Sequence, residues 1–381
     1  MFSSEVNRFT IVTGFLLLNL LRFTLSTGEE LRYFKVATIG GDYPQNQVSS
    51  IAYKDTLTDD SLFLVQSQAG IPLHYFKLIT TEVCFERECR LLNIRVYWNI
   101  TGRYLGFELP AGEFLSKRDH EPFSSEEYER LNDLLANPNL PLGNISFEAL
   151  IETPAPDSVD AVSGATTTDV AKMVVKGAAY TTYTLWNILH GPSRERVAGL
   201  TEKQLTPELI DLILHSPDIS DRVWALNRID PKNTLSPKLS TSIMAFIVGD
   251  DFYLAYTAVR AITAAHLRAE ALQLALFGAY PVASHSIQSM IISKLTEAPY
   301  LSPVLISRSR SLLGTLNGKQ LGDILKWYAH HGVNDLETGQ AVAEILKNEN
   351  RFISRQAYTF LKKMNSFDAG ITAALAAYEQ K

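Results

Sequence analysis

The stretch of the chain best suited to chemistry is a run of small and polar residues near its middle. Residues 160–166 (DAVSGAT) follow a proline-containing loop and precede a segment, 169–189, whose pattern predicts a helix. A loop that enters a helix exposes backbone N–H groups at the positive end of the helix dipole, where phosphates bind readily. Gly164 and Ala165 also let a bulky ligand approach the main chain closely. The stretch therefore predicts a phosphate-bearing ligand at the start of a helix.

The same residues resemble, position by position, the Asp-x-x-Ser/Thr-Gly-Ala-Thr signature of covalent FMN-binding domains. These domains occur in the flavin-carrying subunits of the sodium-pumping NADH–quinone reductase and of Rnf-type complexes, where a flavin transferase joins the FMN phosphate to the last Thr. The resemblance implies that FMN is attached here at Thr166. It implies that four more residues form the binding loop: Asp160, Ser163, Gly164 and Ala165. The alternative is an ordinary helix N-terminus capped by Ser163 or by one of the residues 166–168.

Three aromatic residues of the predicted helix, Tyr180, Tyr183 and Trp186, are candidates to form a wall beside the flavin. The alternative is that they belong to the core, because aromatic residues on an amphipathic helix usually do.

The two cysteines, Cys84 and Cys89, are five positions apart. In an exported protein such a pair favours a local disulfide. Two alternatives are a dithiol that exchanges electrons with the flavin and a part of a metal site. A metal site needs more ligands than this pair and the nearby His74 supply.

His120 lies in a loop just before a clear helix start. Ser124 or Ser125 is the predicted N-cap, and an apolar stripe follows at Tyr128, Leu131, Leu134 and Leu135. His120 is a candidate to contact the flavin ring or to relay a proton near neutral pH. The alternative is a partly exposed loop histidine beside a helix cap.

Strand and loop patterns alternate over residues 29–152. Candidate strands cover residues 32–39, 61–66, 73–81, 92–98 and 103–109. The last two flank a four-residue turn that contains Gly102, which is typical of a β-hairpin. We expect an α+β protein whose N-terminal domain, residues 29–194, is a twisted antiparallel sheet with packed helices, the architecture that the FMN-binding resemblance implies.

From about Leu200 the strand patterns disappear and helical periodicity takes over. Paired amphipathic segments follow one another, and corresponding second helices begin roughly 30–37 residues apart, the spacing of two-helix repeats. We therefore predict an all-α, HEAT-like solenoid over residues 195–381. No catalytic motif is visible in this half, and His330-His331 indicates a helix C-terminus.

The first 28 residues contain an apolar run, 9–21, of the length of a signal-peptide core. They predict a signal peptide or an uncleaved membrane anchor, and hence an exported protein in the periplasm or on the outer cell surface. The net charge of −6, with no basic block, argues against a nucleic-acid partner.

These patterns together predict an extracytoplasmic electron-transfer flavoprotein rather than an enzyme with a small-molecule substrate. FMN on Thr166 would be installed by a flavin transferase. The helical repeats would dock a redox protein or a membrane electron-transfer complex. The alternative is a non-catalytic exported scaffold that acts through its helical repeats. A hydrolase that uses Ser163 is a weaker hypothesis, because no base is spaced around that residue in a familiar arrangement.

Overall fold

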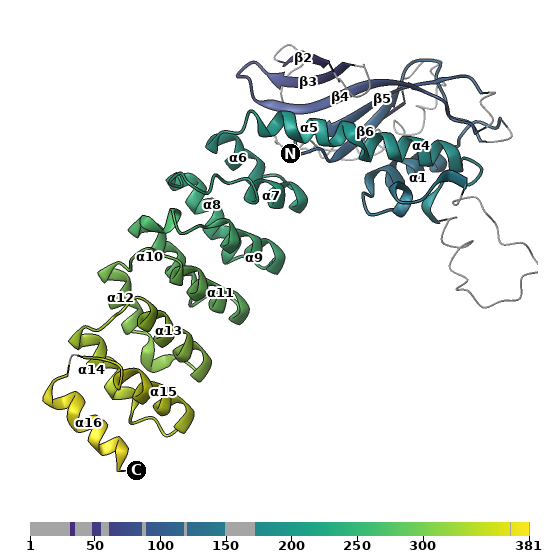
Figure 1. Ribbon diagram of the computed structural model, residues 1–381. Coiled ribbons are helices and arrows are strands. Elements are labelled where there is room, and N and C mark those ends of the chain that lie inside the picture. The colour runs from purple at the N-terminus through teal and green to yellow at the C-terminus, as the bar shows by residue number, and fades with distance from the viewer. Residues whose placement is uncertain are drawn as a thin grey trace, which may run out of the picture.

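The computed structural model describes residues 31–34, 48–54, 61–85, 89–117, 120–148, 172–365 and 367–380. The apolar segment at the N-terminus and the FMN signature, residues 160–166, lie outside the described residues. The described chain is an α+β protein, as expected, with a β-sheet at one end and a row of helices leading away from it (Figure 1). Within the described residues, no helix is both long and apolar enough to cross a bilayer.

The β-sheet is antiparallel, and its described strands lie in the order β1-β6-β5-β4-β3-β2. The strands are β1 (Leu31–Phe34), β2 (Val48–Lys54), β3 (Ser61–Ser67), β4 (Pro72–Thr81), β5 (Leu92–Asn99) and β6 (Tyr104–Leu109). Strands β2 to β6 form a meander, and β1 joins it at the β6 edge. The expected hairpin is β5–β6, and Gly102 in its turn has a φ of +87° that favours glycine.

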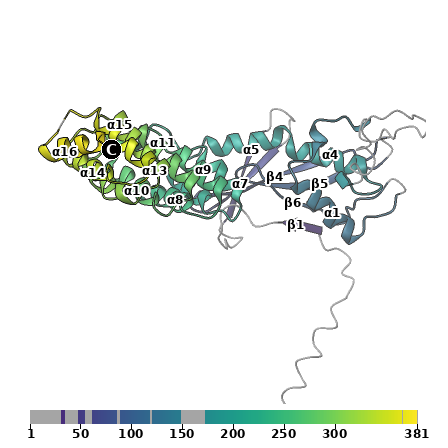
Figure 2. The same cartoon turned by 90° about the horizontal axis from the view of Figure 1, so that it is seen from below.

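Three helices cover one face of the sheet: α1 (Ser125–Ala136), α4 (Ala179–His190) and α5 (Pro192–Glu202) (Figures 1 and 2). Alternate residues of β5 are buried on this side, and the indole of Trp98 donates a hydrogen bond to the Leu189 carbonyl at 3.0 Å. The Thr201 hydroxyl likewise reaches the Tyr75 hydroxyl at 3.3 Å. The boundary predicted after residue 194 falls within α5, which packs on the sheet.

Helix α1 begins as its sequence predicts. The Ser124 hydroxyl accepts a hydrogen bond from the Glu127 N–H, and the Glu127 carboxylate accepts one from the Ser124 N–H, which together form a capping box. The predicted apolar stripe is buried.

The expectation of one continuous helix over 169–189 is wrong. The chain is helical at Lys172 and Met173, then turns, and α4 begins only at Ala179. Gly177 has a φ of +77° in this turn, a left-handed conformation that a helix does not contain. The Val175 N–H donates to the Thr182 hydroxyl at 3.1 Å and so fixes the turn against the new helix.

The C-terminal half consists of helices in the predicted order. They are α6 (Pro207–Leu214), α7 (Ile219–Leu226), α8 (Pro237–Ile247), α9 (Phe252–Ala261), α10 (Glu270–Ala279), α11 (His285–Thr296), α12 (Pro303–Arg310), α13 (Gly318–His330), α14 (Leu336–Ile345), α15 (Arg351–Leu361) and α16 (Ala369–Glu379). Each helix contacts its partner in sequence or the equivalent helix of the next pair, so the pairs stack in a row (Figure 1). We call this row the helical array. As predicted, α13 ends at His330.

The sheet and the helical array meet at a buried carboxylate. Asp221 of α7 is fully buried, and its oxygens accept hydrogen bonds from Asn99 at 2.6 Å, Thr101 at 2.6 Å and Arg103 at 2.8 Å. Asn99 ends β5, and Thr101 and Arg103 lie in the β5–β6 turn. Arg103 Nε donates a further hydrogen bond at 3.3 Å and the Ser216 hydroxyl donates one at 2.7 Å. Asn99 begins an Asn-Ile-Thr glycosylation sequon, yet its side chain is buried in this network and is not accessible to a glycosyltransferase in the folded protein.

Candidate functional site

A cavity of about 710 Å³ lies beside the N-terminal end of α4 and brings together segments that are distant in sequence. We call it the α4 cavity. Its lining comes from the β4–β5 connection, the loop before α1, Phe147 and the start of α4. The residues are Val83, Cys84, Phe85, Cys89, Ser116, Lys117, His120, Phe147 and the run Gly177, Ala178, Ala179, Tyr180 and Thr181. The cavity thus unites Cys84, Cys89 and His120, which the sequence had indicated for separate reasons.

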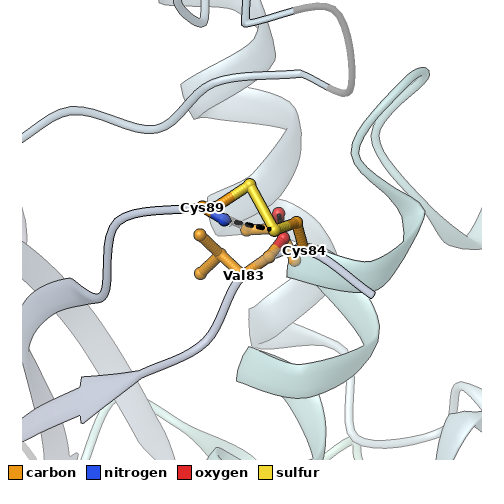
Figure 3. Close-up of a disulfide and its surroundings, with 4 residues drawn as sticks. Val83, Cys84 and Cys89 are labelled. Atoms are coloured by element: carbon orange, nitrogen blue, oxygen red, sulfur yellow. Dashed lines mark hydrogen bonds between the residues drawn. A yellow bond between two sulfur atoms is a disulfide. The ribbon is translucent and has the colours of Figure 1, made fainter. Parts of the chain in front are cut away.

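Cys84 and Cys89 form a disulfide, as predicted, with their Cα atoms 5.8 Å apart (Figure 3). Both residues are half-buried. The backbone N–H of Cys89 donates a hydrogen bond to the Cys84 sulfur at 2.9 Å. The Thr181 hydroxyl donates to the Val83 carbonyl at 3.0 Å and ties the loop to the first turn of α4. The disulfide therefore sits in an anchored loop at the cavity wall.

Three aromatic rings form another part of the wall. The Phe147 ring lies 5.2 Å from Phe85 and 4.9 Å from Tyr180, measured between ring centroids, and the contact with Tyr180 is edge-to-face. Tyr183 and Trp186, which were also candidates for a flavin wall, do not line the cavity. Tyr183 donates to the Ile145 carbonyl and Trp186 to the Asn137 carbonyl, so both serve packing.

Lys117 and His120 project from a tight turn that precedes α1. The Lys117 N–H donates to the Glu121 carbonyl at 2.8 Å, and the His120 N–H donates to the Lys117 carbonyl at 2.9 Å. Hydrogen bonds with the Glu121 and Glu127 carboxylates, at 2.9 and 3.2 Å, raise the pKa of Lys117. The turn therefore places an ion-paired lysine beside the cavity.

His120 has a φ of 60° and is the one non-glycine residue of the described chain with a positive φ. A backbone of this kind costs of order 1–3 kcal/mol and tends to occur where function requires it. Because this strained residue lines the cavity, His120 is a better candidate for a functional role than its position in a loop would indicate.

The start of α4 adds backbone donors to the cavity. The N-cap residue, Ala178, has no side chain that accepts a hydrogen bond from the helix, so the first N–H groups lack a side-chain cap. With the helix dipole, these groups favour negative charge at this end of the cavity.

The five residues of the FMN signature, Asp160, Ser163, Gly164, Ala165 and Thr166, lie outside the described residues. Sequence reasoning missed Lys117, Phe85 and Phe147 as cavity residues. A signal was present for Lys117, which stands three positions before His120 on the same short turn. The two phenylalanines carry no local signal, because only the fold brings them to Tyr180.

Metal chemistry has no candidate among the described residues, where no group of three or more His, Cys, Asp or Glu side chains is placed to hold an ion. Comparison of the chain with models of protein families, with curated proteins and with solved structures finds no match.

A second concave surface lies on the helical array, between α13 and α15, and has a volume of about 470 Å³. We call it the α13–α15 groove. Leu325 and Phe360 are buried along it, whereas Phe352 is 64 % exposed at its edge. Gly322 lets the two helices approach, and Gln356 donates to the Gly318 carbonyl at 2.8 Å across the seam.

The charges of the α13–α15 groove are all of one sign. Lys326, Arg355 and Lys363 line it, and none of its described lining residues is acidic. The whole chain carries a net charge of −6. The groove is therefore a local positive surface on an acidic protein.

Proposed function

We propose that this protein is an exported electron-transfer flavoprotein that carries FMN, joined through its phosphate to Thr166, with the flavin ring in the α4 cavity. The observation that carries the proposal is the convergence of Cys84, Cys89 and His120 on one cavity at the start of α4. The FMN signature lies between two cavity residues in sequence, Phe147 and Gly177. A short tether from Thr166 is thus consistent with a ring bound there.

The described residues fit a flavin in size and chemistry. A volume of about 710 Å³ falls within the range of roughly 300–1,000 Å³ found for small-molecule and cofactor sites. The rings of Phe85, Phe147 and Tyr180 offer aromatic contacts to a planar ring system. The uncapped N–H groups of α4 suit the negative charge of a phosphate or of a reduced flavin ring.

FMN, when bound, supplies one- and two-electron transfer. The chain contributes orientation and electrostatics. The aromatic wall holds the ring and excludes water from one side, while the start of α4 stabilises added negative charge. His120 lines the same cavity and is placed to contact the ring.

The covalent link is tested by intact-mass spectrometry of protein made in an exporting host with an active flavin transferase. The wild type is expected to gain the mass of one FMN less one water. Thr166→Val should lose the adduct, whereas Thr168→Val, a matched change two positions away, should keep it. Absence of the adduct from the wild type, with the transferase active on a control substrate, would refute covalent attachment.

The position of the ring is tested by flavin fluorescence. Tyr180→Leu removes an aromatic ring from the cavity wall, and Tyr183→Leu removes one that packs outside it. Both variants should keep the adduct, but Tyr180→Leu should increase fluorescence because a stacked aromatic side chain quenches flavin emission. Equal fluorescence in the two variants would place the ring elsewhere.

We further propose that the helical array is a HEAT-like repeat domain that docks a partner through the α13–α15 groove. Buried apolar residues, an exposed aromatic edge and three cations suit an acidic, amphipathic segment of a partner protein. The same groove supports the alternative function, an exported scaffold without a cofactor. The adduct experiment separates the two, because a scaffold carries no FMN.

Docking is tested with a synthetic amphipathic peptide that carries Glu on one face and Leu on the other. Lys326→Glu combined with Arg355→Glu should weaken binding about tenfold or more, because like charges then face each other. Lys232→Glu combined with Lys347→Glu makes the same charge change at exposed lysines outside the groove and should bind as the wild type does. Equal binding by all three proteins, or binding to anionic vesicles but not to the peptide, would overturn the proposed partner.

A further inference from the structure

The Cys84–Cys89 disulfide closes a loop that other contacts already close. Strands β4 and β5 are paired up to Thr81 and Leu92, so the sheet holds both ends of the connection. The hydrogen bond from Thr181 to the Val83 carbonyl anchors it a second time. A disulfide stabilises a protein mainly by restricting the unfolded chain, and a bridge between residues five apart restricts it less than one across a long loop. Stabilisation of the folded protein is therefore only a modest reason for the presence of this disulfide.

The two sulfurs are chemically unequal. The Cys89 N–H, a backbone donor, donates a hydrogen bond to the Cys84 sulfur. A hydrogen bond of this kind stabilises a thiolate more than a thiol, so it favours Cys84 as the sulfur that leaves. The incoming nucleophile is then directed to Cys89.

The disulfide is also placed where a reactant can reach it. Both cysteines are half-buried and line the α4 cavity together with Lys117 and His120. The aromatic wall offers apolar surface to the rest of the reactant.

From these observations we infer that Cys84–Cys89 is a redox-active disulfide that accepts two electrons from a dithiol by thiol–disulfide exchange. One thiolate of the dithiol attacks the Cys89 sulfur, a mixed disulfide forms, and Cys84 leaves as a thiolate. The second thiolate of the dithiol attacks its own sulfur in the mixed disulfide and releases Cys89. The dithiol becomes a disulfide, its two protons pass to Cys84 and Cys89 or to solvent, and two electrons reside on the protein.

The experiment uses the full chain from a host without flavin transferase, so it does not depend on the proposed flavin. Native protein is incubated with dithiothreitol in the absence of denaturant, alkylated and mapped by mass spectrometry. Both cysteines should become alkylated while the protein remains folded, with at most a modest decrease in the urea midpoint of unfolding. Resistance to reduction until the protein unfolds, or unfolding on reduction in the absence of urea, would identify a structural disulfide and overturn the inference.

A second measurement tests the direction of attack. With glutathione in place of dithiothreitol and a rapid acid quench, the mixed disulfide should be found on Cys89 rather than Cys84. The single variants form a matched pair: Cys84 in Cys89→Ser should react with iodoacetamide near pH 6.5 at least about tenfold faster than Cys89 in Cys84→Ser. Equal rates, or glutathione on Cys84, would contradict the assigned roles.

Discussion

The helical array and the sheet region build their structures in different ways. In the array, the information is local: Ser236, Asp251 and Asp335 each cap the helix that follows them, and each pair contacts its neighbours. In the sheet region, the α4 cavity draws residues from 83–89, 116–120, 147 and 177–181. The helices of the array are therefore specified by short stretches of sequence, whereas the candidate site forms only when the whole N-terminal region has folded.

The largest effect is expected where the two regions join. Asp221→Ala leaves Arg103 without its buried partner and deprives Asn99 and Thr101 of an acceptor. Breaking a buried ion pair from one side costs roughly 3–5 kcal/mol. Urea unfolding should therefore show a loss of this size and separate the sheet and the array into two transitions. A single transition with a loss below about 1 kcal/mol would mean that the junction does not couple them.

The same carboxylate gives a pH test. Burial alone would raise the pKa of Asp221, but the hydrogen bond and charge of Arg103, with Thr101 and Ser216, outweigh burial and lower it below the ordinary 3.8. Its contribution to stability is therefore complete above the unfolded pKa and is lost as the pH falls through the lower folded pKa. The stability advantage of the wild type over Asp221→Asn should be constant from pH 7 to 5 and shrink below about pH 4. An advantage that already shrinks between pH 7 and 5 would indicate a raised pKa instead.

A core truncation in each region sharpens the comparison. Leu321→Ala in α13 and Leu64→Ala in β3 both remove fully buried side chains, and each should cost about 2–5 kcal/mol. For Leu321→Ala, hydrogen exchange should accelerate only in α11 to α15, because each stacked helix pair is stabilised mainly by contacts with its neighbours. For Leu64→Ala, exchange should accelerate across the sheet, because strands β2 to β6 are hydrogen-bonded to one another in series. Faster exchange in β4 and β5 of Leu321→Ala would contradict the local character of the array.

Glycine substitutions give the smallest expected effects. A Cβ at Gly339 of α14 would lie 2.8 Å from the buried Ile371 of α16, so Gly339→Ala should cost about 1–3 kcal/mol through overpacking. Gly278 of α10 has no atom within 4 Å of an added Cβ, and Gly278→Ala should raise stability by up to about 1 kcal/mol through helix propensity. Thermal unfolding measures both. Equal shifts in the same direction would mean that the α14–α16 seam is looser than its contacts indicate.

Several features were predictable because their causes lie within a few residues. Ser124 and Glu127 define the start of α1, the Asn99–Gly102 turn defines the β5–β6 hairpin, and the spacing of Cys84 and Cys89 predicts their disulfide. The turn at Gly177 was missed because the apolar pattern continues through it, and only the left-handed backbone ends the helix. Strand β2 was not expected, since its β-formers Val48, Ile51 and Tyr53 are interrupted by two serines and an alanine and do not alternate regularly.

The candidate site was harder to predict than the elements. Lys117 lies three positions before His120, so it was predictable as a neighbour of a residue that the sequence already indicated as a site candidate. Phe85 and Phe147 meet Tyr180 only after the sheet and α4 have assembled, and their separation in sequence gives no sign of this contact. Asp221 gave no sign in the sequence of its role, although it accepts hydrogen bonds across the junction from Asn99, Thr101 and Arg103.

The length of the array sets a size requirement for any molecule that uses both concave surfaces. The cavity lies at the start of α4, and the array leads away beyond the end of α5 (Figure 1). From α7 to the far groove the chain makes four helix-to-helix steps, through α9, α11 and α13 to α15, of roughly 8–10 Å each. A compact domain of about 100 residues has a radius of gyration of about 13 Å, so its diameter only about matches these four steps and does not also cover the length of α4 and α5 between the cavity and the array. A partner bound at the far groove must therefore be large, or must carry its reactive group on a flexible linker. The length of that linker would then set the effective concentration of the reactive group at the cavity.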